Sequence, residues 1–516
     1  MPLIISSQNL SKSFSSRPLF TNISLGISDN DRVGMIGPNG SGKSTLLKLL
    51  AGIETPDEGE IAVSRNSRIS YLPQEDMFSV ENTIHEILLS AIDDTHLEDY
   101  EKEVEVAIML DKVGFENPDQ KAKKLSGGWR KRLAIACQLI KKPDLLLMDE
   151  PTNHLDLEGI LWLEKLLKSS HLGESPFAYL VISHDRTFLE SVSSRVIELN
   201  RRYPEGHFNA TGSYSDFLVA RDDFLQGQKQ HQESLENIVR REIEWLRRGP
   251  KARTTKANYR IKEANQMIQN LDEVRYRNAQ TSTVKIDFTS SDRKTKKLLI
   301  AENLKKSMGG HLLFEKLDLI LSPGIKLGLL GLNGSGKTTL LKILRGQLAP
   351  DAGKVECAEH LRTVFFDQNR ESLDNSLTLR RALTPHGDQV VYRDKPMHII
   401  SWAKKFLFQP EQLDTSIKKL SGGERARILI ARLMQEPADL LILDEPTNDL
   451  DIPTLEVLEE SLAEFPGALV LVTHDRYMLD RVSTHLLALD GKGNTEFFAD
   501  YAQWEMAQEE NKKSKL

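Results

Sequence analysis

Two glycine-rich segments have the residue types and spacing that suit a nucleotide phosphate. They read GPNGSGKST from Gly37 to Thr45 and GLNGSGKTT from Gly331 to Thr339. Glycines let consecutive backbone N–H groups turn toward one anion, and a helix that begins there adds its positive end. A single segment could be an ordinary glycine turn, but two, each followed by the same acidic block, favour phosphate binding. The candidate phosphate-binding residues are Gly37, Asn39, Gly40, Gly42, Lys43, Ser44 and Thr45, and Gly331, Asn333, Gly334, Gly336, Lys337, Thr338 and Thr339.

An Asp-Glu pair ends an apolar run downstream of each glycine-rich segment. The blocks are LLLMDEPTNHLD, from Leu145 to Asp156, and LLILDEPTNDLD, from Leu440 to Asp451. Asp149 and Asp444 are placed to hold Mg²⁺, together with the hydroxyls of Ser44 and Thr338. The adjacent Glu150 and Glu445 are candidate catalytic bases, because a carboxylate there can accept the proton of an attacking water. The alternative is a solvated pair at a strand end.

A histidine and a glutamine recur at matching positions in the two halves. His184 lies in ISHDR and His474 in VTHDR, and each could contact a γ-phosphate or orient the water. Gln74 and Gln368 lie 31 residues after the respective lysines and could bridge metal and water. A lone histidine at a strand end is more often structural, and a lone glutamine is usually a surface residue, so the repetition carries these assignments.

These blocks belong to a duplicated domain. The glycine-rich segments are offset by 294 positions, the acidic blocks by 295, the HDR segments by 290, and a fourth motif, LSGG, returns at an offset of 295. Four motifs in one order at a near-constant offset indicate duplication of a whole domain. We expect domains at residues 1–212 and 298–516, with a non-repeated segment at 213–297.

The elements that must position these side chains form a parallel α/β fold. Buried strands are predicted at Arg32–Ile36, Leu145–Met148 and Leu180–Ile182, and a helix at Ser44–Leu50. Each strand delivers polar residues at its carboxyl end, which is where a parallel sheet places its site.

The LSGG motif predicts a second anion-binding helix start in each copy. It spans Leu125–Gly128 and Leu420–Gly423, ahead of helices at Arg130–Leu139 and Arg425–Leu433. Because each copy already has a glycine loop for its own phosphate, the motif makes most sense if it serves a nucleotide held by the other copy.

The segment 213–297 differs from the two copies in charge. It holds 18 Lys and Arg against 12 Asp and Glu, whereas the rest of the chain holds 50 against 63. Helical patterns flank Gly249-Pro250 and predict a two-helix hairpin with a basic tip, followed by a flexible return at Thr281–Lys297. Seven basic residues and no acid between Trp245 and Lys262 favour nucleic-acid contact over a solvated helix surface. The candidate contacts are Arg247, Arg248, Lys251, Arg253, Lys256 and Arg260.

Composition excludes several classes of protein. Two cysteines, Cys137 and Cys357, cannot form a disulfide framework or an iron–sulfur site, which fits a reducing cytoplasm. No apolar run approaches the length of a membrane span, and the N-terminus lacks the features of a signal peptide.

The motif set, present twice, resembles two ATP-binding cassette ATPase domains in tandem, and the charged helical linker resembles the ABC-F class, closest to its Uup group. The ABC-E proteins carry cysteine clusters that this chain lacks. The resemblance implies ATP hydrolysis with ATP and Mg²⁺ as ligands, and two nucleotides held head to tail between the cassettes of one monomer. The first site would combine Lys43, Ser44, Gln74, Asp149, Glu150 and His184 with Ser421 and Gly423. The second would combine Lys337, Thr338, Gln368, Asp444, Glu445 and His474 with Ser126 and Gly128.

The same resemblance implies a cytoplasmic role on the ribosome, in translation or ribosome assembly. The linker would reach toward the peptidyl-transferase region and the P-site tRNA, where a basic tip suits RNA phosphates. Two alternatives stay open: a DNA-associated ATPase, as Uup proteins are described, and the ATPase subunit of a transporter.

Three departures from the family pattern qualify this picture. Phe14 stands where the family stacks an aromatic ring on adenine, but the matching residue of the second copy is Met308, so we expect weaker base stacking there. Only 50 residues separate Gln74 from Leu125, which leaves little room for the helical arm that many relatives insert. Because the sequence continues for only 42 residues after His474, we also expect the C-terminal extension associated with DNA binding in Uup proteins to be missing.

Overall fold

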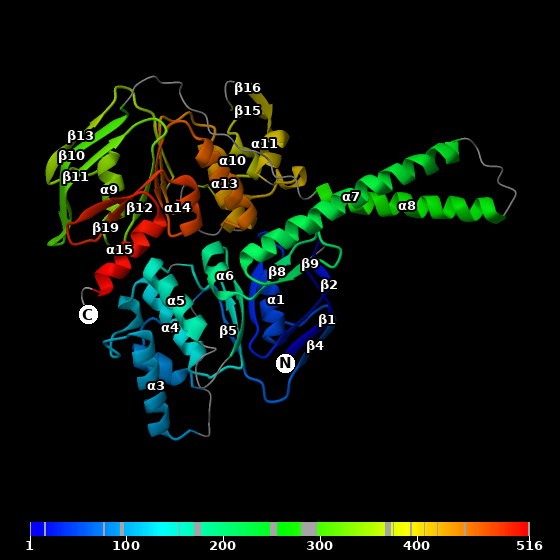
Figure 1. The fold of residues 1–516 in the computed structure, drawn as a ribbon, viewed down its shortest axis with the longest axis horizontal. Coiled ribbons are helices and arrows are strands. Elements are labelled where there is room, and N and C mark those ends of the chain that lie inside the picture. The colour runs from blue at the N-terminus through cyan, green and yellow to red at the C-terminus, as the bar shows by residue number, and fades with distance from the viewer. Residues whose placement is uncertain are drawn as a thin grey trace.

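The computed structural model describes most of the chain. The described residues are 2–14, 17–75, 78–92, 97–153, 155–169, 177–247, 255–279, 297–366, 373–374, 376–392, 395–406, 408–420, 422–447 and 450–513. Two α/β domains and a long helical hairpin are visible in Figure 1. The first domain runs from β1 to β9 and the second from β10 to α15.

The first domain is built on a six-stranded sheet. Its strand order is β5-β6-β7-β3-β8-β9, and all neighbours are parallel except the antiparallel edge pair β8 and β9. The bounds are β3 Arg32–Ile36, β5 Ile69–Leu72, β6 Leu145–Asp149, β7 Ala178–Ile182, β8 Arg195–Leu199 and β9 His207–Thr211. The three strands expected from the sequence are therefore confirmed, and they are neighbours in the order β6-β7-β3.

The second domain repeats this topology. Its sheet has the order β14-β17-β18-β12-β19-β20, again with one antiparallel pair at the edge. The bounds are β12 Lys326–Leu330, β14 Thr363–Phe366, β17 Leu440–Asp444, β18 Ala468–Val472, β19 His485–Leu489 and β20 Thr495–Phe498.

Smaller antiparallel sheets complete each domain. Strands β1 (Leu3–Phe14), β2 (Arg17–Ser28) and β4 (Glu58–Val63) form one, and β10 (Leu299–Met308), β11 (His311–Leu321) and β13 (Ala352–Cys357) form its counterpart. The second domain also carries a hairpin of β15 (Gln389–Tyr392) and β16 (Lys395–His398).

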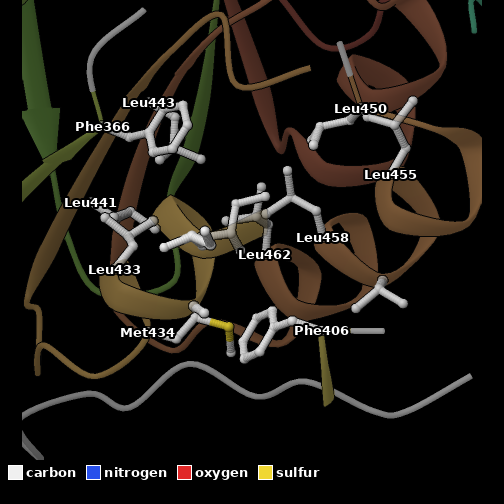
Figure 2. Close-up of a cluster of buried hydrophobic side chains, with 14 of the residues drawn as sticks. Phe366, Phe406, Leu433, Met434, Leu441, Leu443, Leu450, Leu455, Leu458 and Leu462 are labelled. Atoms are coloured by element: carbon white, nitrogen blue, oxygen red, sulfur yellow. The ribbon is translucent and has the colours of Figure 1, made fainter. Parts of the chain in front are cut away.

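Helices pack on the sheets and bury their apolar sides. In the first domain they are α1 Lys43–Leu50, α2 Ile84–Ser90, α3 Asp99–Val113, α4 Gly127–Leu139, α5 Leu157–Ser169 and α6 Arg186–Val192. In the second they are α9 Lys337–Leu344, α10 Leu379–Leu383, α11 Ile399–Lys405, α12 Gly422–Leu433, α13 Ile452–Glu464, α14 Arg476–Val482 and α15 Tyr501–Lys513. Figure 2 shows part of this packing, where Leu441 and Leu443 of β17 face Leu433 of α12 and Leu458 and Leu462 of α13. Dense apolar packing of this kind holds the strand ends in place.

The predicted helical hairpin is present. Helix α7 spans Tyr214–Arg247 and helix α8 spans Thr255–Ala279. They lie side by side and project away from both domains (Figure 1), and Arg275 on α8 pairs with Glu236 on α7 at 2.9 Å. Residues 248–254 and 280–296, which include most of the predicted basic tip and the predicted flexible return, lie outside the described residues. Within the part of the chain that is described, no helix has the length and apolar character needed to cross a bilayer.

Two helices, α2 and α3, occupy the chain between Gln74 and Leu125, where the sequence leaves little room for an inserted arm. Helix α2 begins after Thr83, whose hydroxyl accepts from the N–H of Glu86, and α3 ends at Gly114 in the left-handed conformation. Both helices pack together and against α4, so they belong to the body of the first domain.

Candidate active site

Each glycine-rich loop connects a central strand to the helix that follows it. Gly37 follows β3 with φ of 148°, and a Cβ there would lie 2.4 Å from the carbonyl oxygen of Leu199. Gly331 follows β12 with φ of 150°, and a Cβ would lie 2.6 Å from the carbonyl oxygen of Leu489. Only glycine fits these positions, because φ is strained for other residues and the neighbouring backbone is too close.

The two loop lysines are buried and curl back over their own loops. The Lys43 Nζ donates to the carbonyl oxygens of Gly37 at 2.8 Å and Pro38 at 3.2 Å. Lys337 makes the matching pair of contacts in the second loop, at 2.6 and 3.1 Å. Burial lowers the pKa of both lysines, and nearby carboxylates oppose this effect. Each loop therefore concentrates N–H groups and an amine around one small volume, as an anion site requires.

A hydroxyl and a carboxylate meet beside each loop. The Ser44 Oγ donates to the Asp149 Oδ1 at 3.1 Å, and the Thr338 Oγ1 donates to the Asp444 Oδ2 at 3.5 Å. Burial raises the pKa of Asp149, although Ser44 and Lys43 oppose the shift. A buried carboxylate next to a hydroxyl is the oxygen donor set that Mg²⁺ prefers, and a cation there would relieve the cost of burying the charge.

The glutamate after each of these aspartates contacts the repeated histidine. The His184 Nε2 lies 3.1 Å from the Glu150 Oε1, and the His474 Nε2 lies 3.3 Å from the Glu445 Oε1. Burial lowers the pKa of His184 to about 3 and that of His474 to about 4, so both rings are neutral at physiological pH. Burial also raises the pKa of Glu445 to about 7, against the attraction of Lys337. The four predicted catalytic residues are thus paired, one glutamate and one histidine in each domain.

A cavity of about 390 Å³ opens on the first loop and reaches the second domain. Lys43, Asp149, Glu150 and His184 line it on one side, and Gly423, from the start of α12, lines it on the other. The other predicted site residues that line this cavity are Phe14, Asn39, Gly40, Gly42, Ser44, Thr45 and Gln74.

A second cavity, of about 280 Å³, has the reciprocal arrangement. Lys337, Asp444, Glu445 and His474 come from the second domain, and Gly128 comes from the start of α4 in the first. Asn333 and Thr338 also line it. Ser126 is the N-cap of α4, where its hydroxyl accepts from the N–H of Trp129 at 3.4 Å. The inference that each LSGG motif serves the other copy therefore agrees with the arrangement of both cavities.

Comparison with known proteins identifies the fold and the family. The sequence model of the family described as ABC transporter matches residues 20–153 and 314–448. The translational throttle protein EttA of Escherichia coli K12 is 35% identical, with 93% of this chain and 91% of the relative covered. The ATP-binding protein Uup of Haemophilus influenzae is 34% identical, with 95% and 79% covered. The chain belongs to the ATP-binding cassette family, in its ABC-F class. Each domain is therefore a cassette of the kind that binds and hydrolyses ATP.

Two further comparisons agree with this assignment. The Bacillus subtilis protein YfmR, described as an uncharacterized ABC transporter ATP-binding protein, is 36% identical over 95% of this chain and 81% of its own length. Among solved structures, the archaeal ribosome recycling factor aABCE1, in its complex with the stalk protein aP1, superimposes with a TM-score of 0.68 at 20% identity, covering 97% of this chain and 92% of that one. At that identity the likeness shows the tandem cassette fold alone.

The two cassettes differ at the position where the family resemblance predicts the adenine base. Phe14, at the end of β1, is 54% exposed beside the first cavity, and the matching Met308, at the end of β10, is 55% exposed. The Thr339 hydroxyl lies 3.8 Å from the Met308 sulfur. The first site thus offers an exposed aromatic face and the second offers a thioether.

Two of the predicted site residues lie outside the described residues, namely Gln368 and Ser421. Of the predicted linker contacts, Arg248, Lys251 and Arg253 also lie outside them, and for Arg247, Lys256 and Arg260 only the helical backbone is described. Gln74 lies at the first cavity, and its carbonyl oxygen accepts from the buried Lys131 Nζ of α4 at 2.8 Å.

The acidic blocks contribute residues that the sequence analysis did not assign. Asn153 lines both cavities. The Asp451 carboxylate crosses from the second cassette and accepts from the N–H of Asn39 at 2.8 Å. Asp156, the counterpart of Asp451, lies close enough to Lys337 and His474 for its carboxylate to favour their charged forms and so oppose the lowering of their pKa values. The acidic block repeats through its last aspartate, and this repetition could have identified these residues from the sequence. The repetition does not indicate that the last aspartate faces the other copy.

Proposed function

We propose that the chain binds two ATP molecules with Mg²⁺ between its cassettes and couples their hydrolysis to an action on the ribosome in the cytoplasm. The observation that carries this proposal is the pair of reciprocal cavities. Each has a loop lysine, an Asp-Glu pair and a histidine on one side and the start of an LSGG helix on the other. A nucleotide in either cavity would contact both cassettes and would favour the closed arrangement.

The residues fit a bound Mg²⁺. Ser44 with Asp149, and Thr338 with Asp444, would hold the ion, and Gln74 and Gln368 are the proposed further ligands. A bound Mg²⁺ would neutralise phosphate charge and polarise the γ-phosphate. Lys43 and Lys337 would exchange their loop carbonyl contacts for phosphate oxygens, which are better partners for a buried amine.

The chain's own residues would carry out the proton transfer. Glu150 and Glu445 would each accept a proton from the water that attacks the γ-phosphate. His184 and His474 are neutral, so one ring nitrogen can donate while the other accepts, and each can hold the water or a phosphate oxygen in line. Hydrolysis would remove the γ-phosphate that both cassettes contact, and the cassettes could then separate.

The ribosomal role is supported by the relative and by the linker. EttA, whose name places it in translation, aligns with 93% of this chain. Helices α7 and α8 project away from the cassettes (Figure 1), and the linker is the basic part of an otherwise acidic chain. Because RNA phosphates bind clustered arginine and lysine, we propose that the hairpin contacts ribosomal RNA or tRNA. Association with DNA, the alternative drawn from the resemblance to the Uup group, is the second candidate.

The experiment uses a variant that binds ATP without hydrolysing it. Glu150→Gln combined with Glu445→Gln should reduce the hydrolysis rate by about 100-fold or more, since it removes both bases. With ATP, this variant should sediment with ribosomes on a sucrose gradient. Adding Arg247→Glu, Arg248→Glu, Lys251→Glu and Arg253→Glu should release it from ribosomes.

A matched control tests whether charge alone explains the loss. Lys121, Lys123, Lys305 and Lys354 lie in exposed ion pairs on the two cassettes, away from the hairpin. Changing all four to Glu should leave ribosome binding in place. A trapped variant that stays at the top of the gradient would overturn the ribosomal role, and retention on DNA would favour the second candidate.

A further inference from the structure

Two arginines occupy the same position in the two cassettes and cross to opposite partners. Arg186 and Arg476 each stand two residues after the site histidine, at the start of α6 and α14. The Arg186 guanidinium forms two hydrogen bonds to Glu459 of the second cassette, one of them of 3.2 Å. The Arg476 guanidinium hydrogen-bonds to Glu164 of the first cassette. The interface therefore contains two reciprocal Arg–Glu pairs.

The partner glutamates lie on the helices that follow the acidic blocks. Glu164 on α5 and Glu459 on α13 each stand eight residues after the last aspartate of the block, Asp156 or Asp451. Helix α13 thus contacts the first cassette at two points eight residues apart. Its N-cap Asp451 accepts from the N–H of Asn39, and Glu459 pairs with Arg186. The pair at Arg186 connects the helix that touches the first glycine loop to the turn that carries His184.

Apolar contacts repeat the same reciprocity. Leu157, the first residue of α5, packs in the core of the second cassette, and Ile452, the first residue of α13, packs in the core of the first. Helices α6 and α14 also contact each other across the interface. Each of the helices α5 and α13 is therefore held against the opposite cassette by an apolar residue at its start and an ion pair two turns later.

The two pairs are not identical in their surroundings. Arg186 also lies 3.4 Å from an Asp475 oxygen and 3.9 Å from the centre of the Tyr477 ring, and Glu459 receives a further contact from Arg481 at 3.1 Å. Arg476 has the Asp185 carboxylate nearby. We therefore expect the loss of Arg186 to have the larger effect.

Burial explains why these pairs suit a contact that must form and break. Glu459 is 0% exposed and Arg186 is 3% exposed, so closing the cassettes removes both charges from water. The cost of removing the water offsets much of the attraction, and the net contribution of an intact pair is small. Removing one partner leaves the other buried charge with less compensation, as Glu459 would keep the Arg481 contact without that of Arg186, and this is unfavourable. Such a pair selects one docking geometry without making it irreversible.

We propose that Arg186 and Arg476 are positioning residues for ATP hydrolysis, which hold the histidine turn of each cassette against the other cassette in the closed state. This role rests on the proposed ATP sites. The arginines act through the position of His184 and His474. Their pairs with Glu459 and Glu164 form only when the cassettes dock in the register that brings each LSGG helix to the opposite loop.

The test is a set of charge exchanges. Arg186→Glu should lower kcat about tenfold or more, because Glu459 would face a second carboxylate in the closed state. The dissociation constant for ATP on the opened protein should change less than about twofold, since the loop contacts of Lys43 are untouched. Glu459→Arg should behave in the same way, and the combined exchange should restore most of kcat. The exchange of Arg476 with Glu164 should follow the same pattern with a smaller loss.

Closure is measured on the same variants by energy transfer between dyes. One dye is placed on the exposed Cys357 and the other on Lys121→Cys in the first cassette, while the buried Cys137 stays unlabelled. ATP should raise the transfer in the parent protein and in the double exchange but not in the single variants. Arg380→Glu is the matched control, because Arg380 pairs with Asp388 and Asp414 inside one cassette. It should close and hydrolyse ATP like the parent.

Several outcomes would overturn the proposal. One is that the single variants close and hydrolyse ATP as fast as the parent. Another is that the double exchange has a kcat no higher than that of the worse of its two single variants. If a charge reversal prevents folding, Arg186→Gln, Glu459→Gln and their combination replace it, with non-additive losses in kcat as the expected result. A double-mutant cycle on energy transfer with ATP, in the Glu150→Gln, Glu445→Gln background, separates this role from the proposed function. If ATP closes this background and the cycle shows no coupling, the contact itself is overturned. If ATP does not close the background and the parent does not hydrolyse ATP, the proposed function fails instead.

Discussion

The two site glutamates have an unusual backbone conformation. Glu150 and Glu445 both have φ of 49°, in the left-handed region that residues other than glycine rarely adopt. Their N–H groups donate to the carbonyl oxygens of Ile182 at 3.1 Å and Val472 at 2.9 Å, on the neighbouring strand. These bonds fix the turn after β6 and β17, and the turn directs each carboxylate toward its histidine. Strain held by surrounding structure is typical of functional positions.

Hydrolysis at the second site should depend on pH near neutrality. A base must be ionised, and the pKa of Glu445 is raised to about 7, so the fraction of active base rises as the pH increases through 7. The activity should therefore fall by about tenfold from pH 8 to pH 6, of which about fivefold is lost between pH 7 and pH 6, and should level off above pH 8. The neutral His474, with a pKa of about 4, adds no step in this range.

The measurement is kcat/KM against pH in the Glu150→Gln variant, in which only the second site retains its base. ATP binding at pH 6 and pH 8 is the control, and it should differ little. A flat profile between pH 6 and pH 8 would contradict the assignment of Glu445 as a base with this pKa.

Among the elements, the turn between a central strand and its helix sets the position of the phosphate site. The turn from β12 to α9 requires Gly331, because a Cβ would lie within 2.6 Å of the Leu489 carbonyl oxygen and 2.4 Å of the Ser335 Oγ. Gly331→Ala should therefore push the loop away from β19. We expect ATP affinity at the second site to fall about tenfold or more and the free energy of unfolding to fall by about 1–3 kcal/mol.

A glycine in open space provides the matched control. Gly346 has φ of 70° and no atom within 4 Å of the Cβ position, so Gly346→Ala adds backbone strain without a clash. It should cost about 1 kcal/mol of stability and leave ATP binding intact. Titration with a fluorescent ATP analogue and chemical denaturation measure the two effects. Equal loss of affinity in both variants would rule out the role of the close approach.

The linker begins as part of the first cassette. Tyr214 and Phe217, in the first turn of α7, are buried in its core, and the ring of Phe224 lies 5.0 Å from that of Phe208 on β9. The direction of the hairpin is therefore set by the first cassette. Arg221, one turn further along α7, lies near Glu456 of α13, so the linker also meets the second cassette where the two cassettes join.

For the molecule as a whole, ATP should stabilise the closed arrangement. A ligand that binds only the folded protein adds about 2.7 kcal/mol at 100 times its dissociation constant. With two sites between the cassettes, we expect saturating ATP and Mg²⁺ to raise the melting temperature of the Glu150→Gln, Glu445→Gln variant by several degrees. Adding Lys43→Ala and Lys337→Ala should remove the shift. Thermal unfolding followed by calorimetry measures it, and an unchanged melting temperature with ATP would argue against binding at these sites.

Much of the site could be predicted from the sequence, because its chemistry is concentrated in short segments. The glycine loop, the Asp-Glu pair and the histidine each lie next to a strand or helix that is recognisable from apolar runs within about ten residues. The strands β3, β6 and β7 and the two helices of the hairpin were predicted for the same reason. Because the same motifs recur in the same order in both copies, motifs about 100 residues apart could be assigned to one site.

What the sequence by itself determined is which residues carry the chemistry and which elements hold them. Only the tertiary structure decided what faces what across the interface: Asp451 on Asn39, Arg186 on Glu459 and Arg476 on Glu164. Arg186 and Glu459 are 273 residues apart in the sequence. Each lies on a helix whose apolar pattern is accounted for by packing within its own cassette. A buried ion pair needs exact partners in space, and local propensity contains no information about the surface against which a helix will dock.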